Sequence, residues 1–297
     1  MSYADFVAFR RSLPRTPRLE RQDVRARGVT FAVFTSPPVA DRPPLVCING
    51  GMLYDHSMLW PALSPLAERR QIVLYDQRGR GASSPPADPF AATIDDDALD
   101  VGAIRRALGI RKWDVLGHSW GGGIAMLASA SDLAGVRRLV LVDAVGPTSE
   151  WMAPLRAAVL ERLHGAEHDA VARISEEKLG EPDAALHSEY SRAVYRAWFA
   201  DAEMANRFTP PVATSETGAA VLARLRRDGY DWRPRLRALS SETLVLHAEL
   251  DPLPLTVSRD NSYIISNARH VVVPSSGHMP FWEAPERFFS LVESFLS

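Results

Sequence analysis

The chain has 297 residues, of which 46% are hydrophobic and 24% charged, a balance that excludes disordered and fibrous proteins and indicates a large buried core. Its formal net charge of −2 provides no field that would favour nucleic acid or an anionic membrane as a partner. The single cysteine, Cys47, precludes an intrachain disulfide, and neither a signal-like apolar stretch nor a run of about 18 apolar residues is present, so we expect a cytoplasmic protein.

Short β-rich runs alternate along the chain with longer amphipathic stretches, which predicts a largely parallel sheet covered by helices. The central runs, such as Leu139–Val142, are continuously apolar, and strands that are buried on both faces have this pattern. The eight expected strands are Val24–Ala26, Thr30–Phe34, Leu45–Ile48, Gln71–Tyr75, Trp113–Leu116, Arg138–Val142, Thr243–His247 and His270–Val273.

Helices are expected between the strands, together with one long helical insertion. Residues 147–231 are rich in Ala, Arg and Glu and contain no strand pattern. We interpret them as a helical cap inserted into an α/β core formed by residues 1–146 and 232–297, because insertions are tolerated at loops. The expected core helices are Ser57–Glu68, Asp96–Ala107, Gly121–Leu133 and Pro285–Leu296.

The strongest chemical signal is the motif Gly117-His118-Ser119-Trp120-Gly121. It directly follows a predicted strand and begins a predicted helix, and a serine at such a sharp turn is raised above the sheet. The glycines allow close backbone approach, and the start of the helix supplies N–H groups near a developing oxyanion. We therefore predict that Ser119 is a nucleophile.

A serine hydroxyl needs a base to act as a nucleophile at neutral pH. Among the histidines, His278 lies in a loop between the last predicted strand and the C-terminal helix, where α/β sheets collect catalytic loops. We predict that His278 is the base. The other histidines are His56, His118, His164, His168, His187, His247 and His270.

The base in turn needs a carboxylate that fixes its tautomer. Asp251 follows the predicted strand Thr243–His247 and gives the chain order Ser, Asp, His. Asp143, at the end of the preceding strand, is the alternative, and Asp251 before Pro252 also fits a helix cap. We favour Asp251.

An oxyanion hole requires two backbone N–H groups directed at the developing negative charge. The residue after the nucleophile, Trp120, is the first predicted donor. The second is Gly51, because the pair Gly50-Gly51 after the third predicted strand lets the backbone bend back towards Ser119.

Three segments of the sequence resemble the α/β-hydrolase superfamily and, within it, the proline iminopeptidase-like hydrolases. They are Asn49–Gly51, the run Asp76-Gln77-Arg78-Gly79 with its neighbours, and the serine motif followed by Gly122. The resemblance covers the predicted core but not the cap. It implies an α/β-hydrolase fold and serine hydrolysis.

Departures from the family pattern lie in the loop after the third strand, where Asn49 replaces a histidine, Met52 a proline and Leu53 a glycine. Aminopeptidases of this family also resemble one another in an acidic cap segment that holds the free amino group of the substrate. No close match to it is present here, and Glu189, Glu203 and Glu216 are its candidate substitutes. The resemblance therefore supports serine hydrolysis more than cleavage after proline.

The predicted function is two-step hydrolysis of a small hydrophobic ester, amide or short peptide by a serine hydrolase that needs no metal or organic cofactor. The substrate pocket is expected to be formed by Met52, Trp151, Trp198, Phe199 and Glu203. Three alternatives remain open: a prolyl aminopeptidase, a carbon–carbon bond hydrolase, and a small-ligand receptor that retains the triad without turnover.

Overall fold

The computed structural model of the chain describes residues 4, 8, 11, 12, 17–208 and 213–297. Most of the N-terminal residues on which the localisation prediction depends lie outside these ranges, as does the stretch 209–212 of the predicted cap. Within the ranges described, no helix is long and apolar enough to cross a membrane.

The strands form a single sheet in the order β1-β2-β4-β3-β5-β6-β7-β8. Strand β2 is antiparallel to both β1 and β4, whereas all later neighbours are parallel. The prediction of an eight-stranded, mostly parallel sheet is therefore confirmed. The strands are β1 (Glu20–Ala26), β2 (Val29–Thr35), β3 (Leu45–Ile48), β4 (Ile72–Tyr75), β5 (Trp113–His118), β6 (Val136–Val142), β7 (Glu242–Ala248) and β8 (Ala268–Val273).

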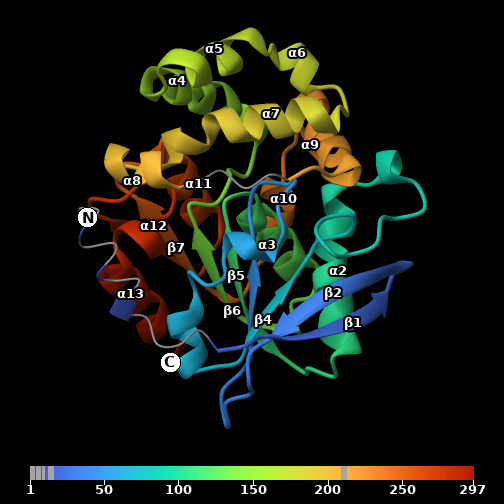
Figure 1. Cartoon of the computed structure of the whole chain (residues 1–297). Helices are drawn as coiled ribbons and strands as arrows, with labels where there is room; N and C mark the ends of the chain where they lie inside the picture. The colour runs from blue at the N-terminus through green and yellow to red at the C-terminus, as the bar shows by residue number, and fades with distance from the viewer. Residues whose placement is uncertain (1–3, 5–7, 9–10, 13–16, 209–212) are drawn as a thin grey trace.

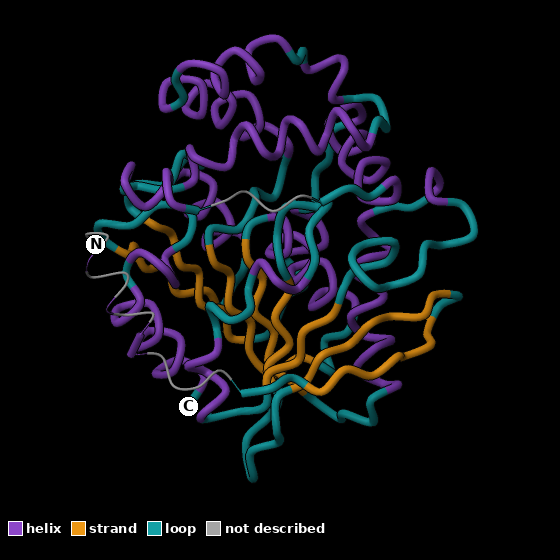
Figure 2. The backbone as a smooth tube through the Cα atoms, in the orientation of Figure 1, coloured by secondary structure: helices purple, strands orange, loops and turns teal. Residues whose placement is uncertain are grey.

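Helices cover both faces of this sheet, as Figure 2 shows by the helices on either side of the strand layer. Strand β6 is buried on both faces, which explains why its sequence is continuously apolar. Leu139 and Leu141 face one hydrophobic cluster, and Val140 and Val142 face the other. The first cluster packs under α2 (Ile94–Ala107), α3 (Trp120–Ser131), α10 (Arg233–Leu236) and α11 (Leu255–Ile264), and the second under α12 (Pro280–Glu283) and α13 (Pro285–Leu296).

One of the four predicted core helices is wrong. Instead of a helix over Ser57–Glu68, the chain forms two short 3-10 helices, η1 (His56–Met58) and η2 (Ser64–Glu68). Pro61 lies between them and has no N–H to donate, so an α-helix cannot continue through it. The other three helices begin and end within two residues of the predicted bounds.

Between β6 and β7 the described chain is helical and lies across the carboxyl ends of the strands, at the top of Figure 1. We call residues 147–231 the helical block. Its two ends are joined by a bridge between Thr148 and Asp231 and by a hydrogen bond from Trp232 N to Pro147 O of 2.8 Å. The helices of the block are η4 (Ser149–Trp151), α4 (Met152–Arg162), α5 (Gly165–Arg173), α6 (Glu176–Leu179), α7 (Ala184–Val194), η5 (Tyr195–Trp198), α8 (Ala202–Arg207) and α9 (Glu216–Asp228). One further short helix, η3 (Pro89–Ala91), precedes α2.

Candidate active site

Ser119 lies at the turn between β5 and α3. Its φ is 56° and its ψ −123°, a strained conformation that residues other than glycine rarely adopt. The turn presses against β3, because a Cβ on Gly121 would lie 2.1 Å from the carbonyl oxygen of Ile48. This geometry raises Ser119 above the carboxyl ends of the parallel strands, where its side chain lines a cavity.

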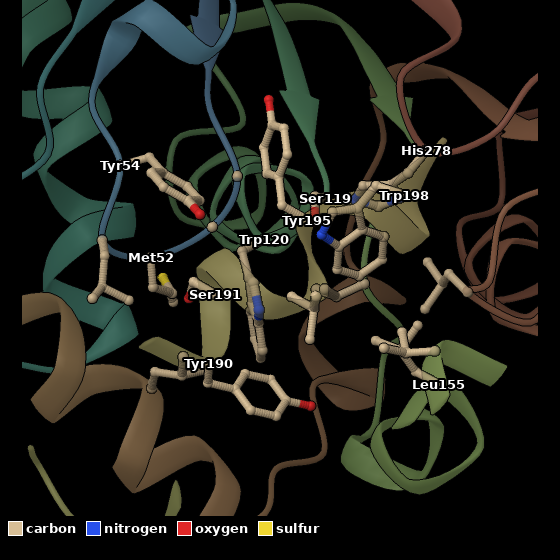
Figure 3. A pocket seen from close by; sticks show the side chains of 18 of the residues that line it. Met52, Tyr54, Ser119, Trp120, Leu155, Tyr190, Ser191, Tyr195, Trp198 and His278 are labelled. Carbon is tan, nitrogen blue, oxygen red and sulfur yellow. The ribbon is translucent and has the colours of Figure 1, made fainter. Parts of the chain in front are cut away.

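His278 and Asp251 come from the loops that follow β8 and β7, and a hydrogen bond of 2.7 Å joins His278 Nδ1 to Asp251 Oδ2. Both residues are buried. His278 lines the same cavity as Ser119, and Figure 3 shows both side chains on its wall. Since Asp251 occupies Nδ1, Nε2 is the ring nitrogen of His278 that is left to face a reactant.

The charge of Asp251 is supported locally. Burial disfavours its ionised form, but the charge and hydrogen bond of His278 outweigh that effect and lower the pKa of Asp251 below its usual value. Asp251 Oδ1 also accepts a hydrogen bond of 2.8 Å from Leu253 N. Asp251 is therefore ionised at neutral pH, and His278 carries its proton on Nδ1.

Asp143, the alternative acid, occupies a different role. Its Oδ1 accepts a hydrogen bond of 2.7 Å from Ala248 N and lies 3.7 Å from His247 Nδ1. Burial and the neighbouring charge of Asp251 raise the pKa of Asp143 well above its usual value. Burial beside the ionised Asp251 therefore favours the protonated form of Asp143.

The loop that carries His278 is fixed from two sides. His118 Nε2 donates a hydrogen bond of 2.8 Å to His278 O, and burial lowers the pKa of His118 to about 3, so this histidine stays neutral. On the other side, His278 N donates to Trp198 O at 2.7 Å. The ring of Trp198 lies over that of His278, with 4.3 Å between their centres.

The glycine loop after β3 lies directly against the serine. A Cβ on Gly50 would be 2.6 Å from Ser119 Cβ, so only glycine fits there. Gly51 and Trp120 both line the cavity, and Trp120 is the first residue of α3, where backbone N–H groups have no partner within the helix.

Two side chains of the family-like segment around Asp76–Gly79, to which the sequence assigned no role, hold this loop in place. Arg80 is fully buried in an ion pair with Asp97 and donates a hydrogen bond of 2.8 Å to Met52 O. Gln77 Nε2 donates to Asn49 O at 3.0 Å. Their role depends on tertiary contacts, so no spacing in the sequence could have indicated it.

The structure brings three of the five predicted pocket residues to the cavity. Met52, Trp151 and Trp198 line it, whereas Phe199 and Glu203 do not. Phe199 packs among other aromatic rings of the helical block, and Glu203 is exposed on α8. Helical periodicity does not show which face of a helix covers a site, so the sequence could not separate these two residues from those on the cavity wall.

Several lining residues were not predicted from the sequence. They come from α4, α7, η5, α9 and the loop before η1, and they give the wall polar and charged points within a largely apolar surface. These residues are Tyr54, Arg156, Tyr190, Ser191, Tyr195 and Arg226.

Two groups of acidic and histidine side chains in the described residues lie close enough together to hold a metal ion. One consists of Asp143, His247 and Asp251, beside the site. The other consists of Asp55, His56 and Asp76, and both oxygens of Asp76 already accept hydrogen bonds within the protein. In the first group, both oxygens of Asp251 are hydrogen-bonded, whereas Asp143 Oδ2 and His247 Nδ1 are buried without a hydrogen-bond partner among the described residues.

Comparison with known proteins agrees with this architecture. The family described as alpha/beta hydrolase fold matches residues 43–285, so the chain belongs to the α/β-hydrolase family. The predicted fold class is thereby confirmed, and so is the prediction that the chain is an enzyme. The crystal structure of VinJ is similar with a TM-score of 0.72 and 21% identity, and the match covers 94% of this chain and 99% of that one.

Two curated relatives refine the likeness. A proline iminopeptidase of Lactobacillus delbrueckii subsp. bulgaricus is 27% identical over 280 residues, which cover 86% of this chain and 90% of the relative. A 2-hydroxymuconate semialdehyde hydrolase of Pseudomonas putida is 31% identical over 241 residues, which cover 78% of each chain. The predicted resemblance to proline iminopeptidase-like hydrolases is confirmed.

Proposed function

We propose that this enzyme is a serine hydrolase that cleaves small, largely hydrophobic esters or amides through a triad of Ser119, His278 and Asp251. The observation that carries the proposal is the 2.7 Å hydrogen bond between His278 and Asp251 on the cavity that the strained Ser119 also faces. Nucleophile, base and orienting acid thus come from three separate loops at one edge of the sheet.

In the proposed mechanism, Ser119 Oγ attacks the substrate carbonyl while His278 Nε2 takes its proton. The backbone N–H groups of Gly51 and Trp120 stabilise the resulting oxyanion. The imidazolium is stabilised by Asp251 and then protonates the leaving group. Water, activated by the same histidine, hydrolyses the acyl-enzyme and releases the acid.

The helical block, residues 147–231, is proposed to act as a lid that selects the substrate, with residues 1–146 and 232–297 as the catalytic core. The block supplies Trp151, Trp198 and Tyr190 to the cavity wall. Figure 3 shows Trp198 beside His278 and the ring of Tyr190 farther along the wall. Aromatic walls of this kind suit an apolar substrate.

The aminopeptidase alternative lacks the feature that it needs. Glu189, Glu203 and Glu216 are all exposed, and among the described residues that line the cavity there is no Asp or Glu. A free amino group would therefore find no carboxylate partner there. This observation favours ester or amide hydrolysis over removal of an N-terminal proline, despite the relatives that bear that name.

A direct assay separates these possibilities. We expect the protein to hydrolyse p-nitrophenyl esters of short acyl length, and we expect Ser119→Ala to lower kcat by about 10⁴-fold or more, since the nucleophile is lost. The comparison substrate is proline p-nitroanilide, which is expected to be cleaved at least 100-fold less efficiently, because its ammonium has no counter-charge.

The outcomes of this assay distinguish the proposed hydrolase from the aminopeptidase and from the receptor. Ester turnover that survives Ser119→Ala would place the chemistry elsewhere. Efficient cleavage of proline p-nitroanilide would establish the aminopeptidase. A ligand-dependent change in intrinsic tryptophan fluorescence without turnover of any ester would favour a receptor.

A further inference from the structure

The cavity wall carries positive charge away from the serine. Besides its two histidines, the charged residues that line it in the described part of the chain are Arg156 of α4 and Arg226 of α9. Both side chains are mostly buried, with 17% and 14% of their surface exposed. The mechanism proposed above uses neither of them.

The two arginines form one group around Tyr190 of α7. The guanidinium carbon of Arg226 lies 5.3 Å from the centre of the Tyr190 ring, and that of Arg156 lies 5.8 Å from it. Three helices of the helical block therefore meet at this ring. We call Arg156, Arg226 and Tyr190 the arginine cluster.

Within the part of the chain that the structure describes, the charge of the arginine cluster is only half balanced. Glu176 is the acidic partner of both arginines, with one oxygen 3.5 Å from Arg156 Nε and the other 2.8 Å from Arg226 Nη1. Its side chain is 48% exposed, so water weakens both contacts. Two cations share one partly solvated carboxylate, which leaves an excess positive charge beside an apolar wall.

Hydrogen bonding is incomplete as well. Arg156 Nη2 donates to the carbonyl oxygens of Val171 and Ile174, at 2.8 and 2.7 Å. Arg156 Nη1 and Arg226 Nε, however, are buried and have no hydrogen-bond partner in the described residues. Buried guanidinium N–H groups without an acceptor are unfavourable, and a carboxylate is the acceptor that suits them best.

We propose that the arginine cluster binds an anionic group, such as a carboxylate, at the end of the substrate remote from the scissile carbonyl. This inference rests on the proposed function, and it narrows the substrate class to an ester or amide with a negatively charged tail and an apolar middle. The same positive charge would repel the ammonium of an N-terminal amino acid.

Matched substrates test the proposal. We would compare the p-nitrophenyl half-ester of adipic acid, which has a free carboxylate, with the same compound capped as a methyl ester. The measured quantity is the ratio of their kcat/KM values. We expect the wild type to prefer the free acid, and Arg226→Met to reduce the ratio by about 10- to 100-fold, the factor that one charge-assisted hydrogen bond supplies.

Controls separate local binding from general charge and from misfolding. Arg227→Met removes the same charge from an exposed site on the same helix and is expected to leave the ratio unchanged. Arg156→Met, on α4, is expected to lower the ratio independently, and Arg226→Lys to retain part of it because the charge remains. A wild-type preference for the capped ester, or equal ratios in Arg226→Met and Arg227→Met, would overturn the anionic site.

A binding measurement distinguishes failure of the anionic site from failure of the proposed hydrolase function. In Ser119→Ala, calorimetry with monomethyl adipate is expected to show binding that Arg226→Met weakens by the same factor. Binding without turnover in the wild type would overturn the hydrolase and keep the anionic site. Turnover of both esters without a preference for the free acid in binding would overturn the anionic site and keep the hydrolase.

Discussion

At the scale of single residues, two aspartates beside the site differ in protonation because their partners differ. Asp251 contacts His278, whose charge and hydrogen bond lower its pKa despite burial. Asp143 accepts a hydrogen bond from Ala248 N, and burial next to Asp251 raises its pKa well above the usual range. The two shifts run in opposite directions, so the negative charge is favoured on Asp251, which is hydrogen-bonded to His278, rather than on Asp143.

This division of roles predicts different effects for the same substitution. Asp251→Asn should lower kcat for p-nitrophenyl ester hydrolysis by about 10⁴-fold, because an amide orients the histidine in the wrong tautomer. Asp143→Asn replaces a neutral acid with a neutral amide of the same shape, so its kcat should fall by no more than about tenfold. A larger loss in Asp143→Asn than in Asp251→Asn would exchange the two assignments.

The pH dependence of stability follows from the same shift. The unfolded chain loses the Asp143 proton near pH 4, whereas the folded protein keeps it to a higher pH, so the free energy of unfolding should fall as pH rises between these values. The slope is at most about 1.4 kcal/mol per pH unit from this group. In urea denaturation between pH 4 and 8, Asp143→Asn should show a smaller decline than the wild type. Parallel curves for the two proteins would contradict a protonated Asp143.

At the scale of elements, a buried carboxylate adds to the contacts of Trp198 in joining the helical block to the loop that carries His278. Glu283 of α12 is buried, and its Oε2 accepts a hydrogen bond of 2.7 Å from Gly277 N, next to His278. Its Oε1 accepts from Ala200 N and Asp201 N, at 2.8 and 3.2 Å, in the segment between η5 and α8. The position of the histidine loop is therefore tied to that of the helical block.

Replacing Glu283 with glutamine tests this connection. The glutamine NH₂ would face one of the backbone N–H groups, so at least one hydrogen bond to a charged acceptor is lost, at about 1.5–3 kcal/mol. We expect Glu283→Gln to lower both kcat for ester hydrolysis and the free energy of unfolding. Glu286→Gln, on the exposed surface of α13, is the matched control. Identical kinetics in the two variants would show that the contact does not position His278.

The packing of the elements also determines how much of the fold and of the candidate site could be predicted from the sequence. The strands of the sheet were predicted because both faces of β3 to β7 are covered, which leaves continuous apolar runs. Ser119 stands out because the strained turn needs its flanking glycines locally. The arginine cluster could not be predicted, since it depends on how α4, α7 and α9 pack. The proline at position 61 was a visible signal against the helix expected over Ser57–Glu68.

At the scale of the whole molecule, the helical block is not uniformly attached to the sheet. Leu222 and Leu225 of α9 belong to the hydrophobic cluster under α2 and α3, and Phe199 and Met204 belong to the cluster under α13. In contrast, the buried side chains of α5 and α6 pack in a separate cluster within the block. The outer helices of the block thus have little apolar contact with the sheet, and we expect them to open at a lower free energy than its core.

Native-state hydrogen exchange would reveal this gradient. Helices α5 (Gly165–Arg173) and α6 (Glu176–Leu179) each have one buried residue, Val171 and Leu179. Exchange of their backbone amides should therefore require only local opening. The side chains of α9 are part of the core of the sheet, so the amides of α9 should exchange only with free energies close to that of global unfolding.

An ester-derived inhibitor attached to Ser119 should slow exchange in α5 and α6 more than in α9. The reason is that Arg156, which lines the cavity, is hydrogen-bonded to Val171 O and Ile174 O in and next to α5. Equal protection of all three helices, with or without inhibitor, would instead indicate that the helical block moves with the sheet as one rigid body and does not open as a lid.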